Sequence, residues 1–117
     1  METIKILGQS NPAATTETTL YTVPDSKAAV ISSIVVCNRD GGNKSFRISV
    51  SYGGAATANK DYLYYDTSMT AHESKEIKIG LTLSNADVIR IYASSTDLSF
   101  NCFGSEFDQP NVYIEPV

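Results

Sequence analysis

The feature that most constrains this chain is a two-step alternation of apolar and polar residues in several short segments. FRISVSY at residues 46–52 and LSFNC at residues 98–102 both place an apolar side chain at every second position. Successive side chains of a β-strand point to opposite faces, so this alternation predicts half-buried strands. No segment shows a sustained helical period. The sequence therefore predicts an all-β fold.

Short apolar or alternating segments follow one another at a spacing of about ten residues, with turn residues between them. They are residues 4–7, 20–24, 28–38, 46–52, 61–66, 75–83, 88–94 and 98–107. This pattern of about eight strands predicts an antiparallel β-sandwich, jelly-roll or immunoglobulin-like, with a small barrel as the alternative. The glycines of RDGGNK, residues 39–44, predict a hairpin that pairs the strands on either side of it.

The alternation also predicts which side chains form the core. We expect these residues to point inward: Val30, Ile34, Val36, Phe46, Ile48, Val50, Tyr52, Ile77, Ile79, Leu81, Leu83, Ile89, Ile91, Leu98 and Phe100. The opposite faces, toward solvent or an oligomer contact, should carry Arg47, Ser49, Ser51, Arg90, Ser99 and Asn101. Each large apolar side chain buried in this way contributes about 1.5–3 kcal/mol. A chain of 117 residues therefore suffices for one core without metals or disulfides.

The charge pattern excludes two classes of partner. Nine basic and 13 acidic residues give a formal charge of −4, and the basic residues are scattered along the chain. Nucleic acids and anionic membranes both require concentrated positive charge, so we expect neither as a partner. The first residues also lack the pattern of a signal peptide, and no apolar run is long enough to span a bilayer. We expect folding in the cytoplasm and free thiols at Cys37 and Cys102 in preference to a disulfide.

Motifs for catalysis or cofactor binding are not found in the sequence. His72, the one histidine, lies in the turn-like TAHES, which favours a solvated residue over a catalytic one. The spacing of the cysteines fits no metal motif, and GGNKS is too short for a phosphate-binding loop. We therefore expect no enzyme, no metal and no cofactor. A glycan hydrolase that uses Asp61 and Asp66 is a distant alternative.

The tyrosines of KDYLYYD are the first candidate interaction site. Tyr62, Tyr64 and Tyr65 offer apolar rings with polar hydroxyls, which suit a protein interface or stacking on a sugar. Simple alternation places Tyr62 and Tyr64 on one face, and Leu63 and Tyr65 on the other. The core or an interface is the favoured reading, and glycan recognition is the alternative. The preceding GGAATANK should form a mobile or closely packed tip.

The C-terminal segment is the second candidate. We assign residues 1–107 to the sandwich and residues 108–117 to an extended arm. Pro110 and Pro116 oppose a helix, whereas Val112, Tyr113 and Ile114 are too apolar for a purely solvated tail. The arm either adds to a neighbouring subunit or packs on its own domain.

Several phrases of the sequence resemble small virion structural proteins of tailed bacteriophages, notably phages of cyanobacteria and marine bacteria. They are IKILGQSNPAATTETTLYTVP, VISSIVVCNRDGGNKSFRISV, KDYLYYDTSM, IGLTLSNADVIRIYAS and DLSFNCFGSEF, which together extend over residues 4–107. The resemblance rests on the order of strand phrases, and Asp108 onward lies outside it. It implies a structural, tail-related or decoration protein of the virion.

Together with these patterns, the resemblance implies a non-enzymatic capsid decoration or cement protein, which we expect to be made in the host cytoplasm and bound to the outer surface of the particle. We expect a homo-oligomer, a trimer in preference, that contacts the major capsid protein or other virion proteins. The alternative is a tail, baseplate or fibre module that attaches to host glycans through the tyrosine strand.

Overall fold

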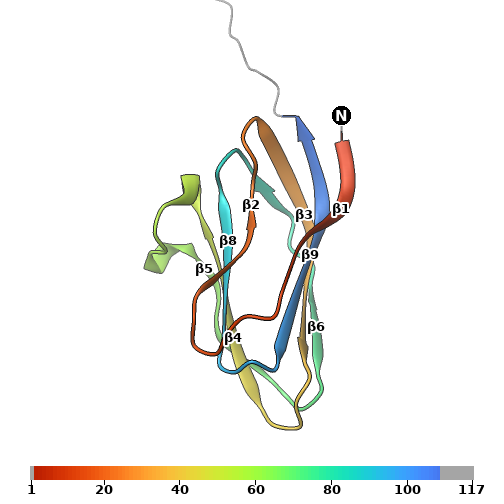
Figure 1. Cartoon of the computed structure of the whole chain (residues 1–117), viewed down its shortest axis with the longest axis vertical. Coiled ribbons are helices and arrows are strands. Elements are labelled where there is room, and N and C mark those ends of the chain that lie inside the picture. The colour runs from red at the N-terminus through yellow and green to blue at the C-terminus, as the bar shows by residue number, and fades with distance from the viewer. Residues whose placement is uncertain (1, 109–117) are drawn as a thin grey trace, which may run out of the picture.

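The structure, a computed structural model, describes residues 2–108. These residues form two packed antiparallel sheets (Figure 1). One sheet has the order β1-β9-β3-β6, with β7 also paired to β3, and the other has the order β2-β8-β4-β5. The strands are β1 (Glu2–Ser10), β2 (Thr18–Thr22), β3 (Lys27–Asn38), β4 (Lys44–Ser51), β5 (Tyr62–Met69), β6 (Ser74–Ile77), β7 (Leu81–Leu83), β8 (Val88–Ala93) and β9 (Leu98–Asp108). The predicted all-β antiparallel sandwich is confirmed. Within the described residues, no helix has the length and apolar character needed to cross a membrane.

The strand pairing follows a nested order. β4 pairs with β5, β3 with β6 and β7, β2 with β8, and β1 with β9, all antiparallel. A long antiparallel hairpin that rolls up on itself produces this nesting in a jelly roll, and its successive strand pairs alternate between the two sheets. Of the two sandwich types that the sequence left open, the structure is therefore the jelly roll.

The predicted hairpin over residues 39–44 is wrong. β3 and β4 belong to different sheets, and the segment between them crosses from one sheet to the other. Asn38 is buried at this corner, where its side-chain amide donates to the carbonyl oxygens of Gly42 and Thr70, both at 2.9 Å. The predicted strand over residues 75–83 is likewise divided into β6 and β7, so the strands number nine in the described residues.

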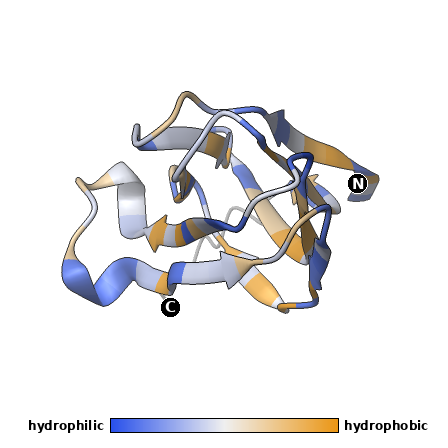
Figure 2. Ribbon diagram, turned by 90° about the horizontal axis from the view of Figure 1, so that it is seen from below, coloured by the Kyte–Doolittle hydropathy of each residue, from blue (hydrophilic) through white to orange (hydrophobic). Residues whose placement is uncertain are grey.

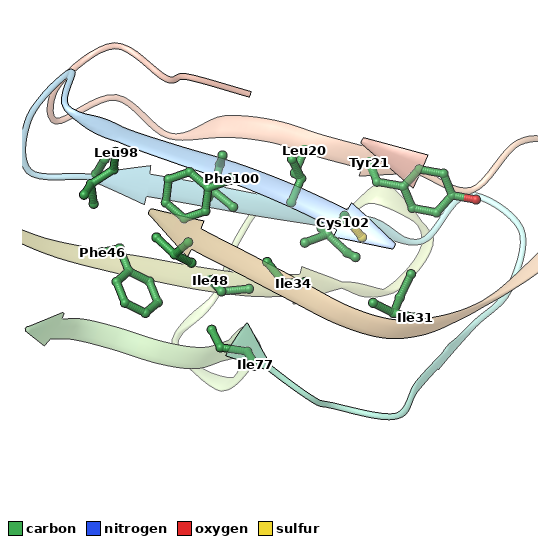
Figure 3. Packing of buried hydrophobic residues seen from close by; sticks show 14 of the residues in the cluster. Leu20, Tyr21, Ile31, Ile34, Phe46, Ile48, Ile77, Leu98, Phe100 and Cys102 are labelled. Atoms are coloured by element: carbon green, nitrogen blue, oxygen red, sulfur yellow. The ribbon is translucent and has the colours of Figure 1, made fainter. Parts of the chain in front are cut away.

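The core fills the space between the sheets (Figure 3). Phe46 on β4 and Phe100 on β9 meet edge to face from opposite sheets, with ring centroids 6.2 Å apart. Most of the residues predicted to point inward are buried there, and Val50, Ile79 and Leu81 pack against the core while partly exposed. The central prediction about the core is thus confirmed.

Two of the predicted core residues lie outside it. Val30 is exposed because β3 contains a bulge between Ile31 and Ser33, which shifts the alternation by one residue. Tyr52 follows the last residue of β4 and begins a short 3₁₀ turn, so its side chain is 84% exposed. Strict two-step counting fails at both positions because the backbone leaves the regular strand path.

Gly104 fits where β9 and the bulged part of β3 come closest. A Cβ atom at this position would collide with the carbonyl oxygen of Val30 and approach the backbone of Ile31. Only glycine therefore allows the two strands to pair through the bulge.

Candidate interaction surfaces

An open apolar groove lies on the outer face of the sheet formed by β1, β9 and β3. It has a volume of about 460 Å³, and its apolar lining comes from Ile4, Ile6, Val30 and Phe103. Ile4 is 83% exposed and Ile6 is 52% exposed. In Figure 2 the ribbon beside the N label shows orange, hydrophobic bands. Large apolar side chains gathered on an open face indicate a contact surface.

Strand register explains why these side chains share one face. Ile4 lies opposite Ser105, and Ile6 lies opposite Phe103. Regular alternation along β1 directs Ile4 and Ile6 outward and Leu7 toward the core, and the bulge between Ile6 and Gly8 shifts the alternation only beyond the two isoleucines. The sequence analysis missed this groove, although the alternating IKI at residues 4–6 was a signal for it.

A cluster of tyrosines around an arginine lies on the outer face of the other sheet. The Arg47 guanidinium stacks between two rings, 4.1 Å from the Tyr65 centroid and 4.2 Å from the Tyr92 centroid. Its Nε also donates to Oδ1 of Asp66 at 2.7 Å, and this hydrogen bond raises the pKa of the arginine. Tyr62 meets Tyr65 edge to face, with centroids 4.9 Å apart. This arrangement holds the aromatic rings in fixed positions.

The predicted faces of the three β5 tyrosines are wrong in part. Tyr62 packs with Tyr65 on the outer face, whereas Tyr64 points inward, with its ring centroid 6.0 Å from that of Phe46. Register shifts on both sides of the pair between Ile48 and Tyr64 account for this change. Tyr65 is the most exposed of the three, at 56%.

Hydrogen bonds from the sheet hold the exposed loop that follows β4. Nη1 of Arg90 donates to Oγ of Ser51 at 2.9 Å and to the carbonyl oxygen of Ala55 at 2.8 Å. Asp87 accepts from the backbone N–H of Gly53 at 2.8 Å. Residues 53–60, the GGAATANK tip, are exposed apart from the partly buried Thr57, so these hydrogen bonds anchor the tip without packing it closely. Ser51, expected at the surface, is buried.

Ser49 is also buried, although alternation placed it on the outer face. It lies between Tyr62 on β5 and Arg90 on β8 in the strand register. Large neighbours on both sides leave this small side chain little contact with solvent.

A buried carboxylate lies at the end of the sandwich where β1 begins and β9 ends. Glu106 is 8% exposed, accepts from the Tyr21 hydroxyl at 2.6 Å and pairs with Nζ of Lys5 at 2.9 Å. The Tyr21 hydrogen bond, helped by Lys5, lowers the pKa of Glu106, although burial acts against this shift. Burial and Glu106 together raise the pKa of Tyr21. Figure 3 shows the tyrosine hydroxyl directed away from the core.

The residues considered for catalysis, His72, Asp61 and Asp66, form no common site. His72 is exposed in a turn at positive φ. Asp61 accepts from the backbone N–H of Ala58 at 2.8 Å, and Asp66 binds Arg47. Residues 2–108 contain no cluster of three or more potential metal ligands.

Both cysteines are free thiols, as expected. Cys102 lies in the core and Cys37 is partly exposed.

Part of the predicted C-terminal arm lies outside the described residues, including Val112, Tyr113 and Ile114. Asp108, which we assigned to the arm, is the last residue of β9 and pairs with Lys27 at 2.6 Å. The arm over residues 109–117 stays a prediction, and in the sequence it follows the last residue of β9.

Comparison with known proteins finds structures of similar fold but no family model or curated protein that matches the sequence. Among solved structures, that of infectious bursal disease virus Gx strain is similar over 96% of this chain, with a TM-score of 0.54 and 14% identity. The structure of the Gt strain of the same virus covers 95% of this chain, with a TM-score of 0.49 and 12% identity. This chain spans 33% of the length of each of these viral chains. The Gx likeness supports the jelly-roll fold.

Proposed function

We propose that this protein is a non-enzymatic structural component of a bacteriophage virion, and that it binds the outer surface of the capsid as a decoration or cement protein. The apolar groove on β1, β9 and β3 carries the proposal, because it offers an open surface on a rigid sandwich for the protein–protein contacts, between copies or with the shell, on which a cement protein depends. A cement protein needs such a surface, since it stabilises the shell by contacts alone.

Two further observations support a role in the virion. The strand phrases resemble small structural proteins of tailed phages, and the fold resembles a chain in the structure of infectious bursal disease virus. Jelly rolls are frequent in viral capsids. Lectins and proteins of other functions have the same fold, so the groove supports the proposed role more strongly than the fold does.

The test is to locate the protein in intact particles of the phage that encodes it. Cryo-electron microscopy should show its density on the outside of the head, at capsomer boundaries. Added purified protein should bind expanded heads that lack it and raise the temperature at which they break. A location confined to the tail, together with no binding to heads, would exclude the cement role.

A tail, baseplate or fibre module that binds host glycans is the second candidate. The aromatic surface formed by Tyr62, Tyr65 and Tyr92 around Arg47 favours it, because tyrosine rings stack on sugars. Under this candidate, the Tyr65→Ala change abolishes adsorption to host cells and leaves the heat stability of particles unchanged. Tyr52→Ala, at an exposed tyrosine outside the cluster, is the matched control. Normal adsorption of the Tyr65→Ala phage would exclude this role for the cluster.

A further inference from the structure

We propose that the groove on β1, β9 and β3 receives the C-terminal segment, residues 109–117, of a second copy of this chain. The inference names the contact that joins two copies of the protein. Its setting in a virion rests on the proposed function. Its structural basis is the groove, the end of β9 and the sequence that follows Asp108.

The spacing of the groove matches the spacing of the apolar residues in the segment. One row across the groove is formed by Ile4 and Val30 beside Ser105, and the next by Ile6 and Phe103. The rows are two residues apart along β9, which is about 6.6 Å. Val112 and Ile114 are also two residues apart in the sequence. Side chains at this spacing share one face of an extended segment, so one can enter each row.

The composition of the segment suits an extended ligand. Pro110 and Pro116 bracket NVYIE, and neither proline has a backbone N–H for a helix. When an extended peptide is recognised, pockets for its alternate side chains give the specificity. The apolar lining of the groove provides such pockets for Val112 and Ile114.

The segment of the same chain falls short of this groove. Proline favours the second position of a β-turn and disfavours the third, so the first favoured reversal after β9 has Pro110 and Asn111 as its central residues, and a hairpin of that register sets Ile114 against Phe107. The two rows of the groove lie at residues 105 and 103, about 7 and 13 Å further along β9. A hairpin in the plane of the sheet is also blocked, because β1 and β3 occupy both sides of β9. A second copy has neither restriction.

The experiment compares full-length chains by analytical ultracentrifugation. The groove variant carries Ile4→Ser and Ile6→Ser, and the arm variant carries Val112→Ser and Ile114→Ser. The control variant carries Tyr52→Ser and Leu63→Ser, two exposed residues elsewhere on the molecule. We expect the wild type and the control to sediment as a multiple of the 12.7 kDa chain. The groove and arm variants should each associate at least about 100-fold more weakly, because each loses two large apolar contacts. Circular dichroism checks that every variant retains the strand fold.

Mixing the two defective variants gives the decisive result. The groove variant keeps an intact arm and the arm variant keeps an intact groove, so an equimolar mixture should form one-to-one pairs although each variant alone is monomeric. A monomeric wild type would overturn the inference. An arm variant that still assembles would also overturn it, because the grooves would then pack on each other. A mixture of the two variants that stays monomeric would overturn it as well. These outcomes are independent of particle imaging, so a protein found on phage heads but monomeric in solution would refute this contact and leave the proposed function standing.

Discussion

The Tyr21→Phe substitution tests the buried carboxylate at the end of the sandwich. It removes one hydroxyl and keeps the ring in the core, so the change is confined to the 2.6 Å hydrogen bond to Glu106. A hydrogen bond to a charged group contributes about 1.5–3 kcal/mol to stability. Lys5 remains 2.9 Å from the other carboxylate oxygen and keeps Glu106 paired. We therefore expect a loss of about 2 kcal/mol, which lowers Tm by about 8 °C in a chain of this size.

The pH dependence follows from the lowered pKa of Glu106 in the folded state. A carboxyl group with a depressed pKa contributes its full stability above the pKa of the unfolded chain, about 4.3, and loses it as pH falls through the folded value. Because the Tyr21 hydrogen bond is the largest cause of this depression, the Tyr21→Phe variant should lose less stability than the wild type in acid. The difference in Tm between the two proteins should be largest near pH 7 and should shrink below about pH 4.

The assay is thermal unfolding followed by circular dichroism from pH 7 to pH 3 at one protein concentration, since association also shifts Tm. Tyr52→Phe is the matched control, because this exposed tyrosine should lose its hydroxyl without effect. Equal Tm values for the Tyr21→Phe variant and the wild type at pH 7 would refute the reasoning. A difference that stays constant down to pH 3 would show that the hydrogen bond does not act through the charge of Glu106.

Four further substitutions or labelling results follow from the core and the loops. Phe100→Ala should cost about 3–5 kcal/mol in urea unfolding, with Phe100→Leu much milder, because the ring is fully buried. Gly104→Val should yield little soluble protein, whereas the same change at the open Gly80 should be tolerated, because a side chain at residue 104 collides with the backbone of β3. Arg90→Lys should speed amide hydrogen exchange at residues 53–58 at least about tenfold without affecting β9, because several loop hydrogen bonds are lost. Burial raises the pKa of the Cys102 thiol to about 12, so a thiol reagent should modify it only on unfolding; rapid modification in the native protein would contradict its buried position.

The sequence predicted the strands well because two-step alternation is a local signal. The segment expected over residues 98–107 is β9 at Leu98–Asp108, and Phe46, Ile48, Leu98 and Phe100 are buried as expected. The hairpin at residues 39–44 failed for a different reason. A loop of that length with two glycines suits a hairpin and also suits a crossing between packed sheets. The crossing forms because β3 pairs with β9 in one sheet while β4 pairs with β8 in the other, and this long-range pairing has no local signal in the sequence.

The surfaces were harder to predict because bulges control them. One inserted residue in β3, between Ile31 and Ser33, turns Val30 outward although Ile34 points inward. In β5, register shifts separate Tyr64 from Tyr62. A bulge changes the facing of every later residue in a strand, and alternation alone does not show where the inserted residue lies.

The two outer faces of the sandwich differ in how their apolar surface is covered, and this difference bears on orientation in an assembly. On the β2-β8-β4-β5 sheet, Arg47 lies against the rings of Tyr65 and Tyr92, and the exposed rings carry hydroxyl groups that bond to water. On the opposite sheet, Ile4 and Ile6 have no comparable cover within the described residues. Water contact with large apolar side chains is unfavourable, so association should cover the β1 face first. In a decorated particle we therefore expect the β1 face to lie against other protein copies and the loop at residues 52–61 to point away from that contact.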